Sequence, residues 1–338
     1  VETSIFKDAV SYLRISFLGT IFLFGFFAFQ SLMRGVGDVK TPLYIVACTV
    51  ILNLFLDPLF IFGFKFIPAM GVAGAALATI ITQALSAFVG IAILLSGKYG
   101  IRLKKENLVV DFKLMKKIFR LGFPASIEQS ARSIGMLALI FIATGFGTTV
   151  IASLGIGIRV LGLVVIPSLG LSIANSTLVG QNLGAGKIKR AEKTSKTVVK
   201  MGFVFLTFLG LLFFIFSKQI AQIFIPSDPA VIEMTASFLR IVSLSFGFIA
   251  VQQILSGAFR GSGNTFVSMT LTILFFWVLR APLAYLLSNF TSLSYTGIWW
   301  AFPIANVSAA LITLTWFAKG SWKNKKLTKE FKLIEESL

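Results

Sequence analysis

The sequence predicts an all-α polytopic membrane protein, and two observations carry this prediction. First, 56% of the 338 residues are hydrophobic and only 13% are charged, about half the charged fraction of an ordinary soluble domain. Second, nine apolar segments are each long enough to cross a bilayer as a helix, which takes about 20 residues. These segments cover residues 12–33, 42–64, 70–96, 121–145, 149–179, 197–217, 231–258, 265–288 and 296–318. So many apolar side chains exceed what a soluble core could bury, and we expect them to face lipid.

The composition excludes most enzyme chemistry. The chain has no His and one Cys, Cys48. Ser-His-Asp triads, His-ligated metal sites, zinc clusters and intrachain disulfides are therefore ruled out. We expect a protein that is not an enzyme and that needs no cofactor.

The formal charge is +18, from 31 Lys and Arg against 13 Asp and Glu. Basic residues are typical both of nucleic-acid surfaces and of the cytoplasmic loops of membrane proteins, so their positions decide between these classes. Loops on one side of the predicted spans and the C-terminal tail hold 23 of them, whereas the other side has only Lys7, Lys65 and Lys218. This bias predicts a cell-membrane protein with a cytoplasmic C-terminus and no nucleic-acid partner.

Tryptophans flank the ninth segment. Trp299 and Trp300 lie at its start, and Trp316 and Trp322 lie at its end. Trp is typical of the two membrane–water interfaces, so we expect these four side chains to act as interfacial anchors.

The polar stretches divide the chain into four parts. Residues 1–97 hold three spans, 98–120 form a basic cytoplasmic connector, 121–318 hold six spans, and 319–338 form a basic cytoplasmic tail. Within the connector, apolar residues alternate with lysines between Leu108 and Phe119, which predicts a short amphipathic helix on the inner membrane surface. A solvated linker helix is the alternative.

The first three and last three spans share a repeated pattern. The repeated pairs are Phe24–Gln30 with Phe246–Gln252, Arg34–Asp38 with Arg260–Asn264, and Pro58 with Pro282. On this pattern the three middle spans would have a counterpart before Val1. We therefore expect the chain to be the C-terminal nine spans of a protein made of two six-helix lobes.

Four motifs, in order along the chain, resemble the multidrug and toxic compound extrusion (MATE) transporters. They are Arg34–Pro42, Asn53–Pro58, Gly71–Thr79 and Val179–Gly186, the last followed by Arg190-Ala191. The resemblance implies a twelve-helix antiporter with two lobes around a central cavity, of which the first three helices are absent here. It also implies export of organic cations in exchange for protons or sodium ions.

Asp57 and Glu128 are the only acids inside the predicted spans. An ionised carboxylate there is costly, by about 2.5–3.5 kcal/mol on insertion scales, and so marks a functional candidate. Asn53 shares a helix face with Asp57, and Pro58 leaves the Leu54 carbonyl without its helical donor. These oxygens suit Na⁺ or a shared proton. The resemblance adds Thr79 to this cation-coupling site, while a purely structural Asp57 is the alternative.

A second candidate site lies in the fourth span. Glu128 and Arg132 are four residues apart and can form an ion pair on one helix face. Together with Gln129, this pair could relay protons or meet substrate, or it could only hold helices together. Arg280-Ala281-Pro282 corresponds in the repeat to Leu56-Asp57-Pro58. Arg280 is therefore a further candidate for this site in the six C-terminal spans.

Three functions remain open at this point. The first is a cation-coupled antiporter that exports drugs or organic cations and acts as a monomer in the lipid bilayer. The second is a flippase for lipid-linked saccharide precursors, for which Arg159 and Arg280 could bind a pyrophosphate. The third is a non-transporting fragment.

Overall fold

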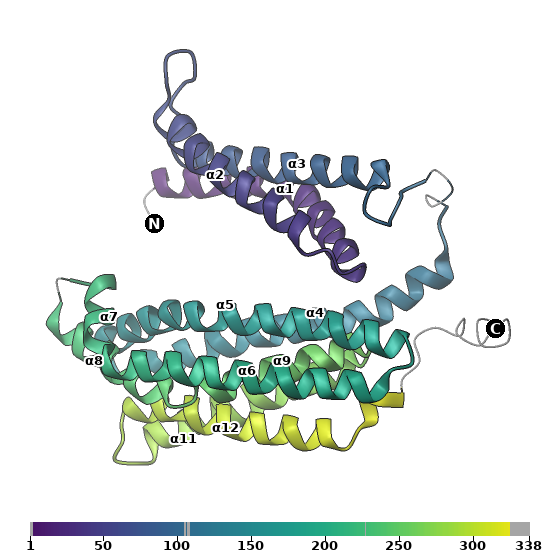
Figure 1. Ribbon diagram of the computed structural model, residues 1–338. Helices are drawn as coiled ribbons and strands as arrows, with labels where there is room; N and C mark the ends of the chain where they lie inside the picture. Colours follow the sequence, from purple (N-terminus) through teal and green to yellow (C-terminus); the bar gives the residue numbers. More distant parts are fainter. Residues whose placement is uncertain (1–2, 105, 107–108, 227, 325–338) are drawn as a thin grey trace. The chain divides into compact units, whose positions relative to one another are not determined.

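The computed structural model describes residues 3–104, 106, 109–226 and 228–324 and is helical almost throughout (Figure 1). Most of the expected tail, 319–338, lies outside these residues. The chain divides into two compact units, residues 1–110 and residues 111–338, here called the N-terminal and C-terminal units.

The N-terminal unit consists of α1 (Thr3–Gly35), α2 (Lys40–Phe62) and α3 (Gly71–Ser96). Helix α3 packs against both other helices. Phe29 and Met33 of α1 are buried against α3, where Ala87 and Leu94 complete the apolar core. Gly74 permits the approach of α2 to α3, because a Cβ atom there would lie 2.3 Å from the Phe60 carbonyl oxygen.

The C-terminal unit holds the remaining helices. They are α4 (Phe112–Thr144), α5 (Thr148–Gly184), α6 (Ile188–Ile215), α7 (Ser217–Phe224), α8 (Pro229–Ser243), α9 (Phe246–Gly261), α10 (Thr265–Ile273), the π-helical η2 (Leu274–Arg280), α11 (Ala281–Asn289), α12 (Thr296–Ala318) and the 3₁₀ turn η3 (Ser321–Asn324). Asp111 and Asp228 cap α4 and α8, each accepting hydrogen bonds from two backbone N–H groups of the first turn. Such caps satisfy donors that have no partner inside the helix.

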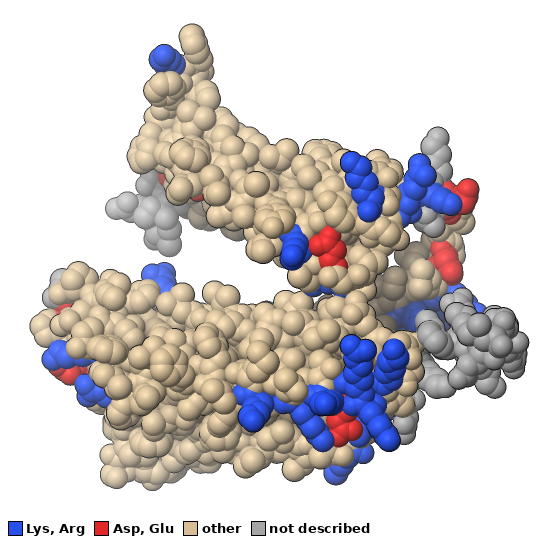
Figure 2. Space-filling model, viewed as in Figure 1, with Lys and Arg blue, Asp and Glu red and all other residues tan. Residues whose placement is uncertain are grey.

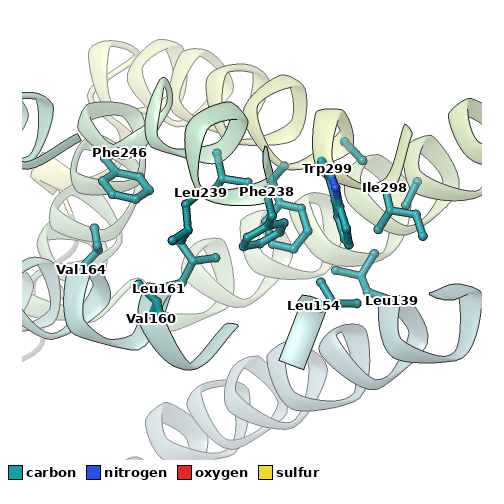
Figure 3. Packing of buried hydrophobic residues seen from close by; sticks show 14 of the residues in the cluster. Leu139, Leu154, Val160, Leu161, Val164, Phe238, Leu239, Phe246, Ile298 and Trp299 are labelled. Carbon is teal, nitrogen blue, oxygen red and sulfur yellow. The ribbon is translucent and has the colours of Figure 1, made fainter. Parts of the chain in front are cut away.

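The core of the C-terminal unit surrounds Phe238 of α8 (Figure 3). Its ring meets Trp299 and Phe302 of α12 edge to face, with ring centroids 5.0 and 5.2 Å apart. The interfacial role expected for Trp299 and Trp322 is therefore wrong, because both side chains are fully buried. Trp300, in contrast, is 38% exposed.

Seven helices of the described chain are long and apolar enough to cross a membrane, and a bent pair, α8 with α9, makes an eighth. The described residues thus contain eight such spans, one fewer than the nine expected. The expected span that is not apolar enough is 121–145, which lies in the 33-residue helix α4. Glu128, Gln129 and Arg132 interrupt the apolar character of α4 near its middle.

The segment expected as a seventh straight span is broken between α8 and α9, which meet at an angle of 57°. At the break the Ser243 and Ser245 hydroxyls donate to carbonyl oxygens three residues back, at 2.9 and 2.8 Å. Such bonds compete with the helical ladder and bend helices. Gly210 of α6 lies beside the break, because a Cβ atom on this residue would be 2.5 Å from the backbone carbonyl oxygen of Ser243.

The eighth segment contains a π-helical stretch directly before Pro282. The Ala281 N–H donates to Phe276 O, five residues back, instead of four. Because Pro282 has no N–H group, it cannot continue the α-helical ladder, and the wider turn absorbs the defect. This turn sets the position of Arg280.

The repeated Arg-Gly-x-Gly turn has the same backbone geometry in both units. Gly37 and Gly263 adopt positive φ angles of 89° and 76°, where glycine has no steric penalty. In one turn the Asp38 N–H donates to Met33 O at 2.9 Å, and in the other the Asn264 N–H donates to Phe259 O at 2.7 Å. The sequence repeat is therefore also a structural repeat.

Asp38 completes the first of these turns. Its carboxylate accepts hydrogen bonds from the Thr41 hydroxyl, at 2.6 Å, and from the Lys40 and Thr41 N–H groups. These bonds, those from Thr41 first, lower the pKa of Asp38 below its ordinary value because they favour the charged form.

The connector differs from its prediction. Within the described residues, 112–119 do not form a separate amphipathic helix but the first turns of α4. Residues 112–120 contain neither Ser, Gly nor Pro, so this stretch has no signal that would end the helix before the membrane span.

Candidate functional site

In the N-terminal unit, a polar pair lies on α2. The Asn53 side-chain amide donates to Asp57 Oδ1 at 3.2 Å, and both residues are half-buried. In the described part of the chain no Lys or Arg forms an ion pair with Asp57. One oxygen of this carboxylate thus accepts a hydrogen bond from a neutral donor, and no described basic residue compensates its charge.

Pro58 follows Asp57 inside α2. Because proline lacks an N–H group, the Leu54 carbonyl, one turn earlier, loses its helical donor. Carboxylate, amide and carbonyl oxygens are therefore close together in sequence on one helix, and all three are hard ligands suited to Na⁺ or to a protonated group.

The structure does not bring Thr79 into this pair. Thr79 is exposed on α3, and its hydroxyl donates to Ala75 O of its own helix at 3.0 Å. Helix α3 does pack against α2, so Thr79 belongs to the adjacent helix but forms no hydrogen bond with Asn53 or Asp57.

In the C-terminal unit, Glu128 is buried, with its side chain only 5% exposed, and is held by two arginines. Arg260 of α9 donates to Glu128 Oε1 at 2.7 Å. The expected partner, Arg132, is more distant, with 3.6 Å between its Nη2 atom and the same oxygen. Gln129 is exposed and takes no part in this ion-pair network.

Two further side chains fix the arginines. Arg260 also donates to Ser172 Oγ of α5 at 2.9 Å, and Arg132 donates to Gln253 Oε1 of α9 at 3.2 Å. The network therefore joins α4, α5 and α9. It holds two guanidinium groups and one carboxylate, so it keeps one positive charge in excess.

Arg280 occupies a separate, apolar environment. It donates to Asn306 Oδ1 at 2.7 Å, and its guanidinium lies 4.1, 4.8 and 4.5 Å from the ring centroids of Phe275, Phe276 and Phe302. Aromatic faces stabilise a desolvated cation. No carboxylate of the described chain pairs with Arg280.

Asn306 extends the contacts of Arg280 to the break between α8 and α9. Its amide donates to Ser245 Oγ at 2.7 Å, and that hydroxyl donates to Val242 O. Arg280, the π-helical turn and the helix break therefore belong to one chain of hydrogen bonds. Arg159, in contrast, is exposed on α5.

Sequence reasoning missed Arg260, Ser172 and Gln253. Arg260 lies at the end of a predicted span, where a basic residue is typical of a cytoplasmic loop, yet its side chain is only 26% exposed. The partners of Arg260, Glu128 and Ser172, lie on other helices, and no spacing in the sequence indicates such a contact.

No group of three His, Cys, Asp or Glu side chains in the described residues is placed to hold a metal ion. Long apolar helices with many exposed apolar side chains and a few buried polar clusters define a polytopic membrane protein. Comparison with known proteins identifies its family.

The family model described as MatE matches residues 2–59 and 124–286, more than half of the chain. The chain is 32% identical over 334 residues to the probable multidrug resistance protein NorM of Thermotoga maritima, covering 98% of this chain and 71% of that protein. A crystal structure of MATE in complex with MaL6 superposes with a TM-score of 0.87 at 25% identity, covering 94% of this chain and 71% of that one.

A second similar structure is a MOP superfamily transporter from Pyrococcus furiosus, described by the reverse polarity of its binding pocket. It has a TM-score of 0.87 and 25% identity over 94% of this chain and 70% of that one. The chain thus belongs to the MATE family of multidrug efflux transporters. Its relatives are transporters and not enzymes.

Proposed function

We propose that this protein is a secondary active antiporter that exports organic cations in exchange for H⁺ or Na⁺, with Asp57 as the coupling residue. Asn53 orients its carboxylate, and Thr79 on the neighbouring helix is a further ligand once its hydroxyl leaves Ala75. The proposal includes a monomeric state and a cytoplasmic C-terminus.

The observation that carries the proposal is the contrast between the two membrane acids. Glu128 already has two guanidinium partners, and the nearer one contacts it at 2.7 Å. Among the side chains that the structure describes, Asp57 has only the neutral Asn53 amide as a partner, at 3.2 Å. An ionised carboxylate within the bilayer needs a counter-charge, so Asp57 has to acquire a proton, a sodium ion or a cationic substrate.

Exchange follows from this competition. One carboxylate neutralises one positive charge, so binding of the coupling ion and of a cationic substrate exclude each other. If Asp57 faces the two sides of the membrane in turn, an inward ion gradient then drives the substrate outward.

The test measures efflux of a fluorescent organic cation from proteoliposomes under an imposed proton or sodium gradient. We expect Asp57→Asn to reduce gradient-driven efflux at least about tenfold, because the amide cannot carry the charge that couples the two fluxes. Asp8→Asn, the same change at an exposed carboxylate at the start of α1, is the matched control. Efflux at the wild-type rate in Asp57→Asn would reject the coupling role.

A second candidate, a flippase for lipid-linked saccharide precursors, is favoured by the charges of the C-terminal unit. Arg132 and Arg260 share the one carboxylate of Glu128, and Arg280 pairs with no carboxylate of the described residues. Guanidinium groups bind phosphates well. Translocation of a pyrophosphate-linked lipid, together with no cation efflux under either gradient, would favour this function over the antiporter.

A further inference from the structure

Four lysines follow one face of the first three turns of α6. Lys189, Lys193, Lys196 and Lys200 are spaced by four, three and four residues, which places them on the same side of the helix. All four are exposed. Together with Glu192 and Thr197 of the same helix they line a shallow, open hollow of ≈ 380 Å³ on its surface, here called the α6 groove.

Most of the positive charge of the α6 groove is not neutralised by carboxylates of the described residues. Glu192 is its only acid, and both carboxylate oxygens are taken, one by Lys196 at 2.7 Å and the other by Lys323 of η3 at 2.6 Å. Lys189, Lys193 and Lys200 pair with no carboxylate of the described chain. Figure 2 shows basic side chains gathered around a single acidic one at this end of α6.

The same helix face turns apolar immediately beyond Lys200. Val204, Phe208 and Leu211 continue the stripe and are 58, 59 and 55% exposed. At a rise of 1.5 Å per residue, Val204 lies about 6 Å from Lys200 along the axis, and Leu211 about 10 Å further. The apolar stretch therefore fits within one leaflet, whose hydrocarbon is about 15 Å thick.

The opposite face of α6 is fixed to the protein. Ser195 is buried and donates to Asn175 Oδ1 of α5 at 3.0 Å. At Gly202 a Cβ atom would lie 2.4 Å from Ile254 of α9, so the helix backbone approaches α9 closely. The lysine face consequently points outward, and its orientation does not depend on flexible segments.

We propose that the α6 groove binds the headgroup of an anionic phospholipid, with the acyl chains along Val204, Phe208 and Leu211. The charge order along the helix, cationic and then apolar, matches the order of phosphate and hydrocarbon in one leaflet. Basic side chains near the membrane surface attract anionic lipid, and Lys189, Lys193 and Lys200, which no carboxylate of the described residues neutralises, supply this attraction from one helix face.

The test is binding of phosphatidylglycerol and of phosphatidylcholine with identical acyl chains to the delipidated full chain, measured by native mass spectrometry. We expect phosphatidylglycerol to bind at least about tenfold more tightly. The triple variant Lys189→Gln, Lys193→Gln, Lys200→Gln should lose this preference. It leaves the Lys196–Glu192–Lys323 bridges in place.

Two further variants separate a site from a general effect of charge. Lys98→Gln, Lys113→Gln, Lys116→Gln removes the same charge from exposed positions elsewhere and should keep the preference within about twofold. Lys189→Arg, Lys193→Arg, Lys200→Arg keeps the charge and should keep binding. Equal affinity for the two lipids, an unchanged preference in the groove variant, or equal losses in groove and control variants would each overturn the proposal. Displacement of phosphatidylglycerol by millimolar inorganic phosphate would likewise overturn it, since a free anion and not a lipid would then suffice.

Discussion

Two carboxylates within the membrane helices, Glu128 and Asp57, differ in whether the protein pairs them with a basic side chain. Glu128 is enclosed and neutralised, whereas Asp57 on α2 has an amide as its only side-chain partner in the described chain. The charge of a carboxylate that already contacts guanidinium groups is compensated within the protein, whereas a carboxylate without such a partner remains available for an ion. Substitution of Glu128 should therefore affect stability, whereas substitution of Asp57 should affect transport.

Removing the Glu128 charge should destabilise the C-terminal unit. Glu128→Gln leaves Arg132 and Arg260 without a counter-charge, and loss of one partner of a buried pair costs about 3–5 kcal/mol. We expect the lower end of this range, because both guanidinium groups are about a quarter exposed. Thermal unfolding in detergent measures the change.

Glu233→Gln is the matched control for Glu128→Gln. Glu233 pairs with Lys218, and both side chains are about half exposed, so its loss should lower the unfolding temperature far less than the loss of Glu128 does. Equal shifts for the two variants would show that the Glu128 network does not stabilise the protein.

At the scale of helices, glycines decide which pairs approach closely. Gly261 of α9 lies against α5, and a Cβ atom there would be 2.2 Å from Ser176 O. The repeat equivalent, Gly35 at the end of α1, has no atom within 4 Å of its Cβ position. The two turns share a backbone but not an environment.

This difference predicts unequal effects of the same substitution. Gly261→Ala should destabilise the protein by about 1–3 kcal/mol, because the backbones of α5 and α9 have to separate. Gly35→Ala should be neutral or stabilising by up to about 1 kcal/mol, since alanine favours the helix. Unfolding measurements on both variants test the contact, and a Gly35→Ala loss as large as that of Gly261→Ala would contradict it.

For the whole molecule, the basic residues predict the orientation. From the bias of Lys and Arg toward one side, we expect the C-terminus and the α6 groove to lie in the cytoplasm. Because Cys48 is the sole cysteine and is exposed, Cys48→Ser gives a thiol-free background in which single sites can be labelled.

In that background, Phe66→Cys and Lys319→Cys should label differently. Phe66 lies between α2 and α3 and is 97% exposed, and Lys319 follows α12 and is also exposed. A membrane-impermeant maleimide added to intact cells should modify residue 66, and residue 319 only after permeabilisation. The reverse pattern would invert the topology.

The sequence alone determined the class, most spans, the repeat and the Asn53–Asp57 pair, because all of these depend on composition or on spacing within one helix. Only the tertiary structure decided that Arg260 is the nearer partner of Glu128, 132 residues away. It also decided that Trp299 lies in the core, that α8 and α9 meet at a break, and that Thr79 bonds to its own helix. Local patterns fix which segments become helices, whereas the partners of a side chain depend on which helices pack together, and hydropathy along one chain does not encode that choice.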